Sequence, residues 1–546
     1  MTTSTGGYAI KTTRRRFSID RWAFSAFLIA ALVMVPIGVV LSSFFRPDDE
    51  VWRHLVETVL SEVLFNTLWL IVGVAVGTGF VGVSLAWLTA ATEFPGRKFF
   101  EWALMLPMAI PGYVTAFVAI GLLDFSGPVQ TGLRAYFGEA VRLPEIRSRA
   151  GVIWVMTLTL YPYVYLLARN AFLTQGRRAL EAAQSLGMGR FAGFFRVALP
   201  MARPWIVGGM MLALMETLAD FGTVATFNYD TFATLIYKAW FGLFSISAAS
   251  QLASLLVLLV FLFLLMEQCV TSRTQYTRIE RGAVRGDRIV LSSGMKWVTC
   301  AYAGLVLSVA FLIPVGQLVL WSKEGVGQDL DARYFDYLSH SLFLAGMAAL
   351  LTVATVLVLV YANRFHPSAP VRILVRVATL GYALPGSVLA VGMVIPLAWL
   401  DRRLGAVFNL EIFLQGTLLA MILAYLVRFL AVAFQPIQSA IQRMSPNIDA
   451  ASRNLGCSGF GMMRRVYLPI LRGGMMTGLV LVFVDVLKEM PMTLMTRPFG
   501  WDTLAVRIFE MTSEGEWQRA ALPAVALVLA GLLPVILLIR EQGKSI

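Results

Sequence analysis

The fold of this chain is indicated by a short stretch that occurs twice, first as Glu181-Ala182-Ala183-Gln184-Ser185-Leu186-Gly187 and again as Ala450-Ala451-Ser452-Arg453-Asn454-Leu455-Gly456. In each copy the glycine precedes a proline, Pro200 or Pro469, by thirteen positions. Each copy also lies in an arginine-containing segment between two apolar segments. A pattern repeated with the same internal spacing predicts two equivalent structural units in one chain.

The residue types in this stretch suit a helix that docks onto another protein. Small residues such as Ala183 and Ala451 let a helix approach a partner surface closely, while Gly187 and Gly456 allow the chain to turn sharply after that helix. A compact helix with a small-residue face, held outside a bilayer, fits into a groove on a second protein. One copy alone could be an ordinary basic loop with a chance Ala-Ala pair. Two copies at equivalent positions favour docking.

The composition is that of a polytopic membrane protein. The chain has 546 residues, of which 58% are hydrophobic and only 14% charged, and its mean hydropathy is +0.73. Runs long enough to cross a hydrocarbon core of roughly 30 Å recur along the chain. We expect twelve spans, near residues 22–45, 65–92, 99–123, 150–168, 204–226, 243–266, 297–321, 341–361, 377–400, 412–434, 473–495 and 520–539.

An even number of spans places both termini on one side, and the distribution of Lys and Arg predicts which side. If the N-terminus is cytoplasmic, both docking stretches and most of the basic clusters are cytoplasmic too, as the positive-inside rule requires. Those clusters are Lys11, Arg14, Arg15, Arg16, Arg21, Arg273, Arg278, Arg281, Arg285, Arg288, Arg540 and Lys544. The net charge of +13 therefore reflects topology and attraction to anionic membrane lipid. Nucleic-acid binding is not expected, because no segment between spans is large enough for a folded basic domain.

The repeat extends beyond the docking stretches, so the chain divides into two halves of six spans. We expect a first half over residues 1–269, a basic cytoplasmic linker over 270–296 and a second half over 297–546, with docking loops near 177–203 and 443–472. Each loop follows the same number of spans, so the two halves have the same orientation. Their pseudo-two-fold axis then runs along the membrane normal.

The third and ninth spans are each interrupted by a Pro-Gly pair, Pro111-Gly112 and Pro385-Gly386. Proline removes a helical hydrogen bond and frees a backbone carbonyl that lipid cannot satisfy. We therefore expect these helices to kink against protein or water near the axis. The kinks could serve packing alone or take part in gating, and the sequence leaves both open.

Spans five and eleven carry acidic residues at matching distances from the repeated glycines. Glu216 matches Asp485 and Asp220 matches Glu489, and each pair is spaced i, i+4 on one helical face. An acidic side chain at mid-membrane costs about 2.5–3.5 kcal/mol, so these residues should face the interior of the protein. They could line a path for a cationic or metal-containing solute, or lock the two halves together with Lys488 as a partner.

Enzymatic and resident-metal chemistry find little support in the sequence. Three cysteines and three histidines are dispersed, without the spacing of a disulfide framework or a metal cage. No G-x-x-x-x-G-K-[ST] loop for ATP is present. We expect no catalytic residues, no resident metal and no bound cofactor in this chain.

The two stretches resemble the EAA-x3-G-x9-I-x-L-P loop of permease subunits of binding-protein-dependent ABC importers. Val197 stands at the Ile position of the first copy, and the second copy lacks the leading Glu, although Asp449 lies one residue earlier. Over nearly its full length the chain resembles the fused permeases of ferric-iron ABC importers. The more specific part lies in Glu216-Thr217-Leu218-Ala219-Asp220-Phe221-Gly222-Thr223, Leu487-Lys488-Glu489-Met490-Pro491 and Arg497-Pro498-Phe499-Gly500-Trp501-Asp502-Thr503-Leu504-Ala505.

This resemblance implies an all-α membrane protein with about twelve helices, arranged as two parallel six-helix pseudo-repeats of the type I importer fold. It implies a place in the bacterial inner membrane with both termini cytoplasmic. A periplasmic binding protein would deliver ferric iron, and two copies of a cytoplasmic ABC ATPase would dock on the two loops and hydrolyse ATP there. The coupling residues would be Glu181, Ala182, Ala183, Gly187, Pro200, Asp449, Ala450, Ala451, Gly456 and Pro469.

Other transport functions remain open on the sequence. A fused permease for thiamine or a phosphonate shares this architecture, and an ion-coupled secondary transporter would also have twelve spans and a pseudo-repeat. A secondary transporter would not need two docking helices with small-residue faces. Four intramembrane carboxylates against the single Lys488 suit a metal cation better than an anion, but thiamine is cationic as well.

Overall fold

The computed structural model describes residues 21–45, 50–176, 183, 187–271, 288–365, 368–408, 414–457 and 459–544. Helices make up nearly all of this structure, with short 3₁₀ or π segments written η. The elements of the first half are α1 (Arg21–Ser43), α2 (Glu50–Thr58), α3 (Leu60–Ala91), β1 (Thr92–Glu93), α4 (Arg97–Ala103), η1 (Leu106–Ala109), α5 (Gly112–Leu123), α6 (Pro128–Phe137), α7 (Arg149–Ala171), η2 (Phe172–Gly176), α9 (Arg190–Gly193), η3 (Phe194–Ala198), α10 (Leu199–Ala219), α11 (Gly222–Thr226), α12 (Phe232–Tyr237), η4 (Lys238–Gly242) and α13 (Ile246–Thr271).

The second half repeats this order of long and broken helices. Its elements are β2 (Ile289–Val290), α14 (Ser293–Leu307), η5 (Ser308–Leu312), α15 (Ile313–Asp329), α16 (Ala332–Phe365), α17 (Ala369–Ala378), η6 (Leu380–Ala383), α18 (Gly386–Phe408), η7 (Leu414–Gly416), α19 (Leu418–Gln442), α20 (Pro446–Asn454), α21 (Gly459–Met462), η8 (Met463–Tyr467), α22 (Leu468–Lys488), α23 (Pro491–Thr496), α24 (Leu504–Ser513) and α25 (Trp517–Lys544).

The part of the chain that the structure describes contains ten helices long and apolar enough to cross a membrane, or eleven if one bent pair counts as a span. The expected number of twelve is therefore not confirmed. The bent pair is the ninth expected span, where α17 with η6 meets α18 at 116°. The twelfth falls in α25, of which Trp517–Leu533 is an apolar helix.

The third span differs from the single helix expected over residues 99–123, because the chain breaks there as it does in the ninth. In the first half α4 and η1 precede Pro111, and α5 begins only at Gly112. The residues before the two prolines, Ile110 and Leu384, are both extended, with φ near −91° and −95°, as steric conflict with a following proline ring requires. The Pro-Gly pairs therefore end one helical segment and start another, which is a stronger effect than a kink.

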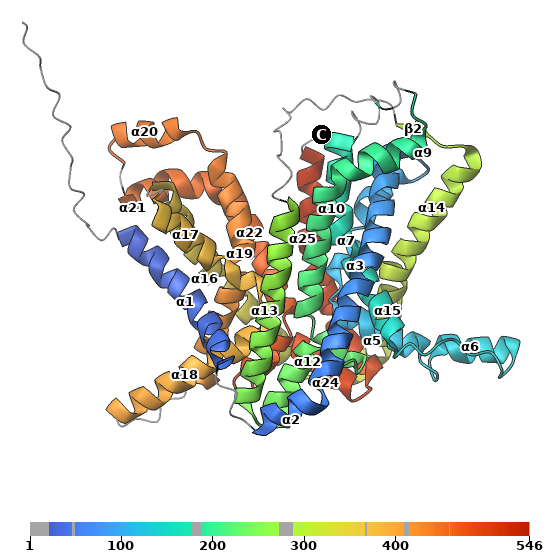
Figure 1. Ribbon diagram of the computed structural model, residues 1–546, viewed down its shortest axis with the longest axis horizontal. Coiled ribbons are helices and arrows are strands. Elements are labelled where there is room, and N and C mark those ends of the chain that lie inside the picture. Colours follow the sequence, from blue (N-terminus) through green and yellow to red (C-terminus); the bar gives the residue numbers. More distant parts are fainter. Residues whose placement is uncertain are drawn as a thin grey trace, which may run out of the picture.

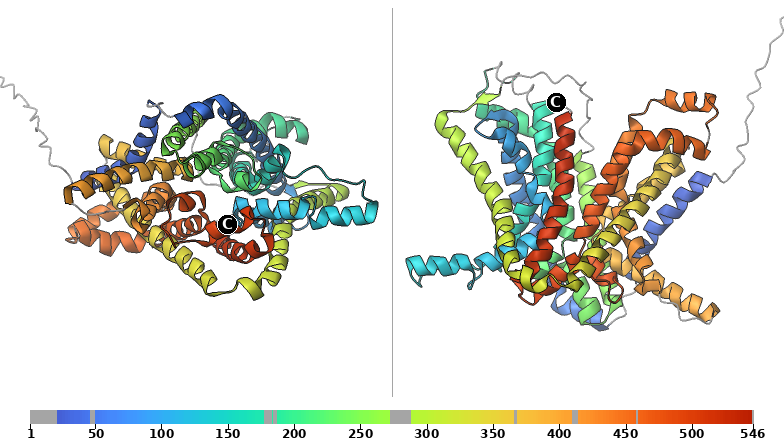
Figure 2. Two further views of the ribbon diagram at one scale, coloured as in Figure 1. Left: turned by 90° about the horizontal axis from the view of Figure 1, so that it is seen from below. Right: turned by 180° about the vertical axis from the view of Figure 1, so that it is seen from behind.

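The two halves are interlocked rather than placed side by side. Helix α1 of the first half packs against α17 and α18 of the second, and α15 of the second half packs against α5 of the first as well as α25 of its own. Figure 1 shows the result as two lobes, with α1 beside α16, α17 and α19 in one lobe and α14 beside α3 and α7 in the other. The lobes meet at the end that carries α2, α12 and α24 and diverge toward the end that carries α9 and α20, as the right-hand view of Figure 2 also shows.

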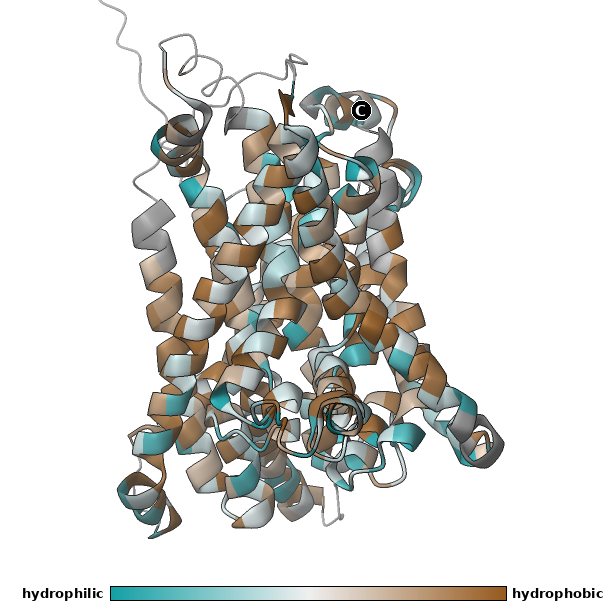
Figure 3. Ribbon diagram, turned by 90° about the vertical axis from the view of Figure 1, so that its right-hand side faces the viewer, coloured by the Kyte–Doolittle hydropathy of each residue, from teal (hydrophilic) through white to brown (hydrophobic). Residues whose placement is uncertain are grey.

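Close packing within each half depends on small residues. A Cβ placed on Gly82 of α3 would lie 2.7 Å from the Val164 side chain of α7, and one placed on Gly209 of α10 would lie 2.8 Å from the Val164 backbone. Helix α7 is therefore held between α3 and α10 at backbone contact distance, as in other membrane bundles. Apolar residues such as Phe80, 72% exposed, cover the outer surface, and apolar residues dominate the long helices in Figure 3.

A two-stranded parallel sheet ties the start of the second half to the end of α3. Thr92 pairs with Ile289 and Glu93 with Val290. Glu93 also forms ion pairs with Arg97 at 3.2 Å and with Arg288 at 3.3 Å. Burial, followed by the neighbouring Arg288, lowers the pKa of Arg97. The described end of the linker between the halves, which includes Arg288 and β2, thus contacts the end of α3 in the first half.

Candidate functional site

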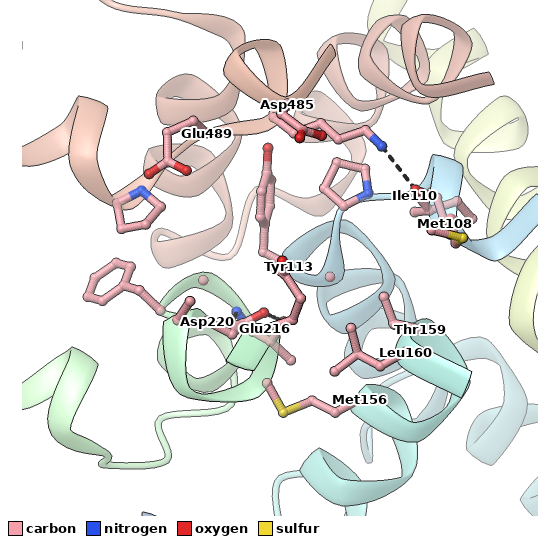
Figure 4. A pocket seen from close by; sticks show the side chains of 18 of the residues that line it. Met108, Ile110, Tyr113, Met156, Thr159, Leu160, Glu216, Asp220, Asp485 and Glu489 are labelled. Atoms are coloured by element: carbon pink, nitrogen blue, oxygen red, sulfur yellow. Dashed lines mark hydrogen bonds between the residues drawn. The ribbon is translucent and has the colours of Figure 1, made fainter. Parts of the chain in front are cut away.

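A cavity of about 260 Å³ lies between the two halves and is lined by residues of both. All four acidic residues that the i, i+4 spacing singled out line it, two from α10 and the residue after it and two from α22 and the residue after it. Figure 4 shows Glu216, Asp220, Asp485 and Glu489 around this space, with Tyr113 between Asp220 and Glu489. The structure therefore brings together residues that are far apart in sequence and equivalent in the repeat.

Asp220 and Glu489 each cap the short helix that follows a long one. Asp220 accepts from the backbone N–H and the hydroxyl of Thr223, both at 2.7 Å, and so caps α11. Glu489 accepts from the backbone N–H of Met492 at 3.0 Å and caps α23. A carboxylate at this position satisfies amides that the helix itself leaves unpaired. These two residues therefore have a structural role as well as a place in the cavity wall.

The Pro-Gly breaks meet these caps, which explains why glycine follows each proline. A Cβ placed on Gly112 would lie 2.9 Å from Asp220 Oδ2, and one on Gly386 would lie 2.6 Å from Glu489 Oε1. Pro111 and Gly112 line the cavity. Gly386 packs behind its wall, against Glu489 and Arg428, and Pro385 precedes it at the start of α18. In each half the glycine at the Pro-Gly break of one span thus contacts the carboxylate at which a second long helix ends.

Glu216 and Lys488 form hydrogen bonds that cross between the halves. Tyr382 of η6 donates its hydroxyl to Glu216 Oε1 at 3.0 Å. Lys488 of α22 donates to the Met108 carbonyl of η1 at 2.9 Å, the bond drawn as a dashed line near Met108 in Figure 4. Among the described residues, no ion pair within 4 Å joins Lys488 to a carboxylate, so the pairing of Lys488 that belonged to the structural alternative is not found in this structure.

The structure adds polar residues that sequence reasoning missed. Arg428, Tyr113, Tyr163 and Tyr382 also line the cavity. Arg428 lies on α19 and pairs with Glu489 through Nη2 and Oε2 at 3.4 Å. The count of a single cation facing four carboxylates is therefore wrong. A lone arginine inside the apolar run 412–434 was the signal that could have revealed it, because ionisable residues in spans are costly.

The carboxylates share a wall without forming a chelating cage. Within the described residues, no group of three or more His, Cys, Asp and Glu side chains is placed so that it could hold a metal ion. Two of the four acids are already engaged as helix caps and a third accepts from a tyrosine. The arrangement can attract a cation electrostatically but offers it no dedicated coordination sphere.

The glycines that end the two docking stretches have the same backbone conformation. Gly187 and Gly456 have φ of +82° and +77°, in the left-handed region that favours glycine. Just beyond them Met188 donates to the Ala183 carbonyl at 3.0 Å and Cys457 to the Ser452 carbonyl at 2.9 Å, the bond that closes a helix with a left-handed glycine. Pro200 and Pro469 occupy the first turns of α10 and α22. Glu181 and Ala182 lie outside the described residues.

In the second loop the acidic residue faces its own half. Asp449 of α20 pairs with Arg364 of α16 at 3.0 Å and accepts from the Tyr467 hydroxyl at 2.5 Å. Ala450 and Ala451 are exposed. The helix is thus anchored on one side by an ion pair and presents small side chains on the other. Figure 1 shows α20 at the end of the molecule where the lobes diverge.

Comparison with known proteins identifies the family. The family described as "Binding-protein-dependent transport system inner membrane component" matches residues 79–274 and again residues 354–540. The chain is 27% identical over 491 residues to a Fe(3+)-transport system permease protein of Haemophilus influenzae, covering 89% of this chain and 91% of that protein. It is 24% identical over 487 residues to the ferric transport system permease protein of Actinobacillus pleuropneumoniae, covering 84% and 68%.

A further relative matches a shorter stretch of the chain. It is the molybdenum transport system permease protein of Escherichia coli, 28% identical over 146 residues, which are 27% of this chain and 62% of that protein. The two family matches together span most of the chain, and each contains one docking loop and one pair of cavity carboxylates. This chain therefore belongs to the family of inner-membrane components of binding-protein-dependent transport systems, and it carries the family's domain twice in one polypeptide.

Proposed function

We propose that this chain is the permease subunit of an ATP-driven importer that moves ferric iron across the bacterial inner membrane. The observation that carries the proposal is the placement of Glu216, Asp220, Asp485 and Glu489 around one cavity between the halves. Two relatives that cover more than four fifths of the chain are named for ferric iron. A wall of carboxylates that attracts a cation and does not chelate it suits transport, because a solute must leave the site as readily as it enters.

Movement of the two lobes would give alternating access to this cavity. In our proposal two copies of a cytoplasmic ABC ATPase dock on α20 and on the corresponding part of the first loop, around Gly187. ATP-driven approach of the ATPases would bring together the lobe ends that diverge in Figure 1. Both chain termini would lie on that cytoplasmic side. A periplasmic binding protein would deliver the solute at the opposite end, near α12 and α24. The permease itself would bind no cofactor, and ATP would act on the partner.

The substrate is tested by growth and uptake in a strain that lacks this gene. We expect the deletion to grow poorly under iron restriction, to be rescued by added ferric salt and to recover uptake of radioactive iron only with the intact gene. A growth defect that thiamine alone cures would assign the chain to thiamine transport instead. Stoichiometric copurification of an ABC ATPase with the detergent-solubilised chain tests the energy source, and its absence would favour a secondary carrier.

A further inference from the structure

Two helices extend sideways from the lobes, away from the end that carries the docking helix α20. They are α6 and the far part of α18, residues 397–408, and they lie on opposite sides of the molecule in Figure 1 and in the right-hand view of Figure 2. Each follows the Pro-Gly break of its own half, because α5 starts at Gly112 and α18 starts at Gly386. These two projecting helices are therefore equivalent parts of the repeat.

Each projecting helix has an apolar face that stays exposed in the described part of the chain. Tyr136 of α6 is 91% exposed and Val407 of α18 is 74% exposed. The apolar residues recur at the spacing of one helical face, as Val129, Leu133, Tyr136 and Phe137 on α6 and Leu397, Leu400, Leu404, Val407 and Phe408 on α18. A helix of the length of α6 measures about 15 Å, which is too short to cross a hydrocarbon core of about 30 Å.

Both projecting helices bring arginines beside an exposed aromatic ring. The guanidinium carbon of Arg134 lies 4.0 Å from the centre of the Phe125 ring, and that of Arg142, in the segment after α6, lies 5.8 Å from it. In the second half Arg403 lies 5.5 Å from the centre of the Trp399 ring and directly follows another arginine. None of these four arginines forms an ion pair with a described residue. Their positive charges are thus available to an anionic partner.

A buried polar side chain fixes the position of each projecting helix. Gln130 of α6 donates to the carbonyl of Leu123, the last residue of α5, at 3.0 Å. Asp401 of α18 accepts from the backbone N–H groups of Leu414 at 2.8 Å and Gln415 at 3.3 Å. Both side chains are buried although the helices that carry them are mostly exposed. The fold therefore holds each helix in place while its apolar face stays exposed.

A phospholipid surface complements the apolar faces and the arginines together. An interfacial helix buries its apolar face about 5–10 Å into the boundary between headgroups and acyl chains, and aromatic side chains favour that depth. Arginine carries its charge on a long apolar stem and reaches the phosphates from there. The two helices point away from each other (Figure 1), to the sides where the lobes expose lipid-facing residues such as Phe80. A single soluble partner docked between the lobes would not cover both.

We propose that α6 and residues 397–408 of α18 are interfacial helices, which lie in the surface of the membrane leaflet opposite the docking loops and place Arg134, Arg142, Arg402 and Arg403 at the lipid phosphates. Under the proposed function this leaflet is the periplasmic one, but the lipid contact itself does not depend on the solute. Along the chain each projecting helix follows a Pro-Gly break whose glycine contacts a cavity carboxylate. The membrane surface would therefore hold the outer end of a segment whose inner end meets the cavity wall.

The depth of both helices is tested with a fluorescent NBD label on the full-length chain in phosphatidylcholine nanodiscs. In a C269S/C300S/C457S background, single cysteines are introduced as Y136C and F408C on the apolar faces, T131C on the opposite face of α6, and E514C in the turn after α24. All four positions are exposed, so the label should not disturb the fold. Lipid with a nitroxide at acyl carbon 5 should remove about half or more of the fluorescence at Y136C and F408C, less at T131C and least at E514C.

The arginines are tested by comparing nitroxide-labelled phosphatidylglycerol with nitroxide-labelled phosphatidylcholine at the same fraction. The anionic lipid should quench Y136C and F408C more strongly, and R134Q/R142Q and R402Q/R403Q should lower its local enrichment by about fivefold or more at an unchanged melting temperature.

Three results would overturn the inference. The first is fluorescence at Y136C and F408C as bright as at E514C in the presence of the nitroxide lipid, which would place both helices in water. The second is equal quenching by the two lipids when all four arginines are present. The third is protection of both sites from aqueous iodide only after the solute-binding protein is added, which would assign the helices to that protein. Iron uptake enters none of these measurements, so the inference and the proposed function fail separately.

Discussion

At the scale of single residues, the four cavity carboxylates divide into two kinds. Asp220 and Glu489 end long helices and cap the short ones that follow, whereas Glu216 and Asp485 lie one turn earlier and cap nothing. These caps each lie within one half, so the structural role of Asp220 and Glu489 differs from the lock between the halves that the sequence left as an alternative. The i, i+4 spacing that made the pairs visible is also what places one member at the helix end and the other inside it.

Replacement of the capping residues should lower stability. D220A removes the acceptor of the Thr223 N–H and should cost about 0.5–2 kcal/mol, whereas D220N retains a capping oxygen and should cost less. E489Q leaves Arg428 without its anionic partner and should cost about 3–5 kcal/mol. Thermal unfolding of the purified variants measures these differences. Equal melting temperatures for D220A, D220N and the wild type would show that Asp220 is no cap.

The sequence could predict the cavity carboxylates but not their partners. Glu216 and Asp485 stand out because charges in apolar runs are rare and these two recur at matching positions. Tyr382 is an ordinary aromatic residue in a span, and its bond to Glu216 joins residues 166 positions apart, which no local pattern encodes. Arg428 was detectable as a lone charge, yet its pairing with Glu489 depends on how α19 packs against the end of α22. The side to which Asp449 turns was likewise decided by tertiary contacts with Arg364 and Tyr467.

At the scale of elements, the broken spans and the docking helices depend on particular glycines. Gly386 allows α18 to start against Glu489 and Arg428. G386A should overpack this contact and cost about 1–3 kcal/mol. Gly346 of α16 has no neighbour within 4 Å of an added Cβ, so G346A is a matched control that should be neutral or slightly stabilising. A lower melting temperature for G346A than for G386A would contradict the packing described for α18.

The left-handed glycine after α20 offers a test of coupling. G456A forces an alanine into positive φ, at a cost of roughly 1–2 kcal/mol, and should loosen the end of the helix without disturbing the spans. We expect normal membrane insertion and cavity binding but weaker stimulation of ATP hydrolysis by the solute-loaded binding protein. G416A, at a glycine with space around it and without positive φ, should behave as wild type. Wild-type coupling in a G187W/G456W double variant would refute the docking role of both loops.

At the scale of the whole molecule, each lobe is built from both halves. Because α1 packs against α17 and α18, the first half on its own would expose the face of α1 that those helices cover, and the second half would lose its outer helix. The two halves should therefore depend on each other even when no peptide bond joins them. The parallel pairing of Thr92–Glu93 with Ile289–Val290 adds a further connection.

A split chain tests this interlocking. A cut after residue 280 severs no described helix or strand. We expect the two fragments to copurify and to restore function when expressed together, while either fragment alone is degraded. Deletion of residues 1–44 should destabilise the second fragment in the same experiment, because α17 and α18 lose their partner. A stable, separately purified first half would contradict the interlocked arrangement.

The central claim is that the solute passes the cavity that Glu216 and Asp485 line from opposite halves. The most direct measurement is the initial rate of radioactive iron uptake in cells, compared among the wild type, the charge-removing E216Q/D485N, the charge-preserving exchange E216D/D485E and the exposed control E514Q. We predict that E216Q/D485N loses most of its iron uptake although its expression and its association with the ATPase stay normal. E216D/D485E and E514Q should retain uptake. Unchanged uptake in E216Q/D485N would contradict the account.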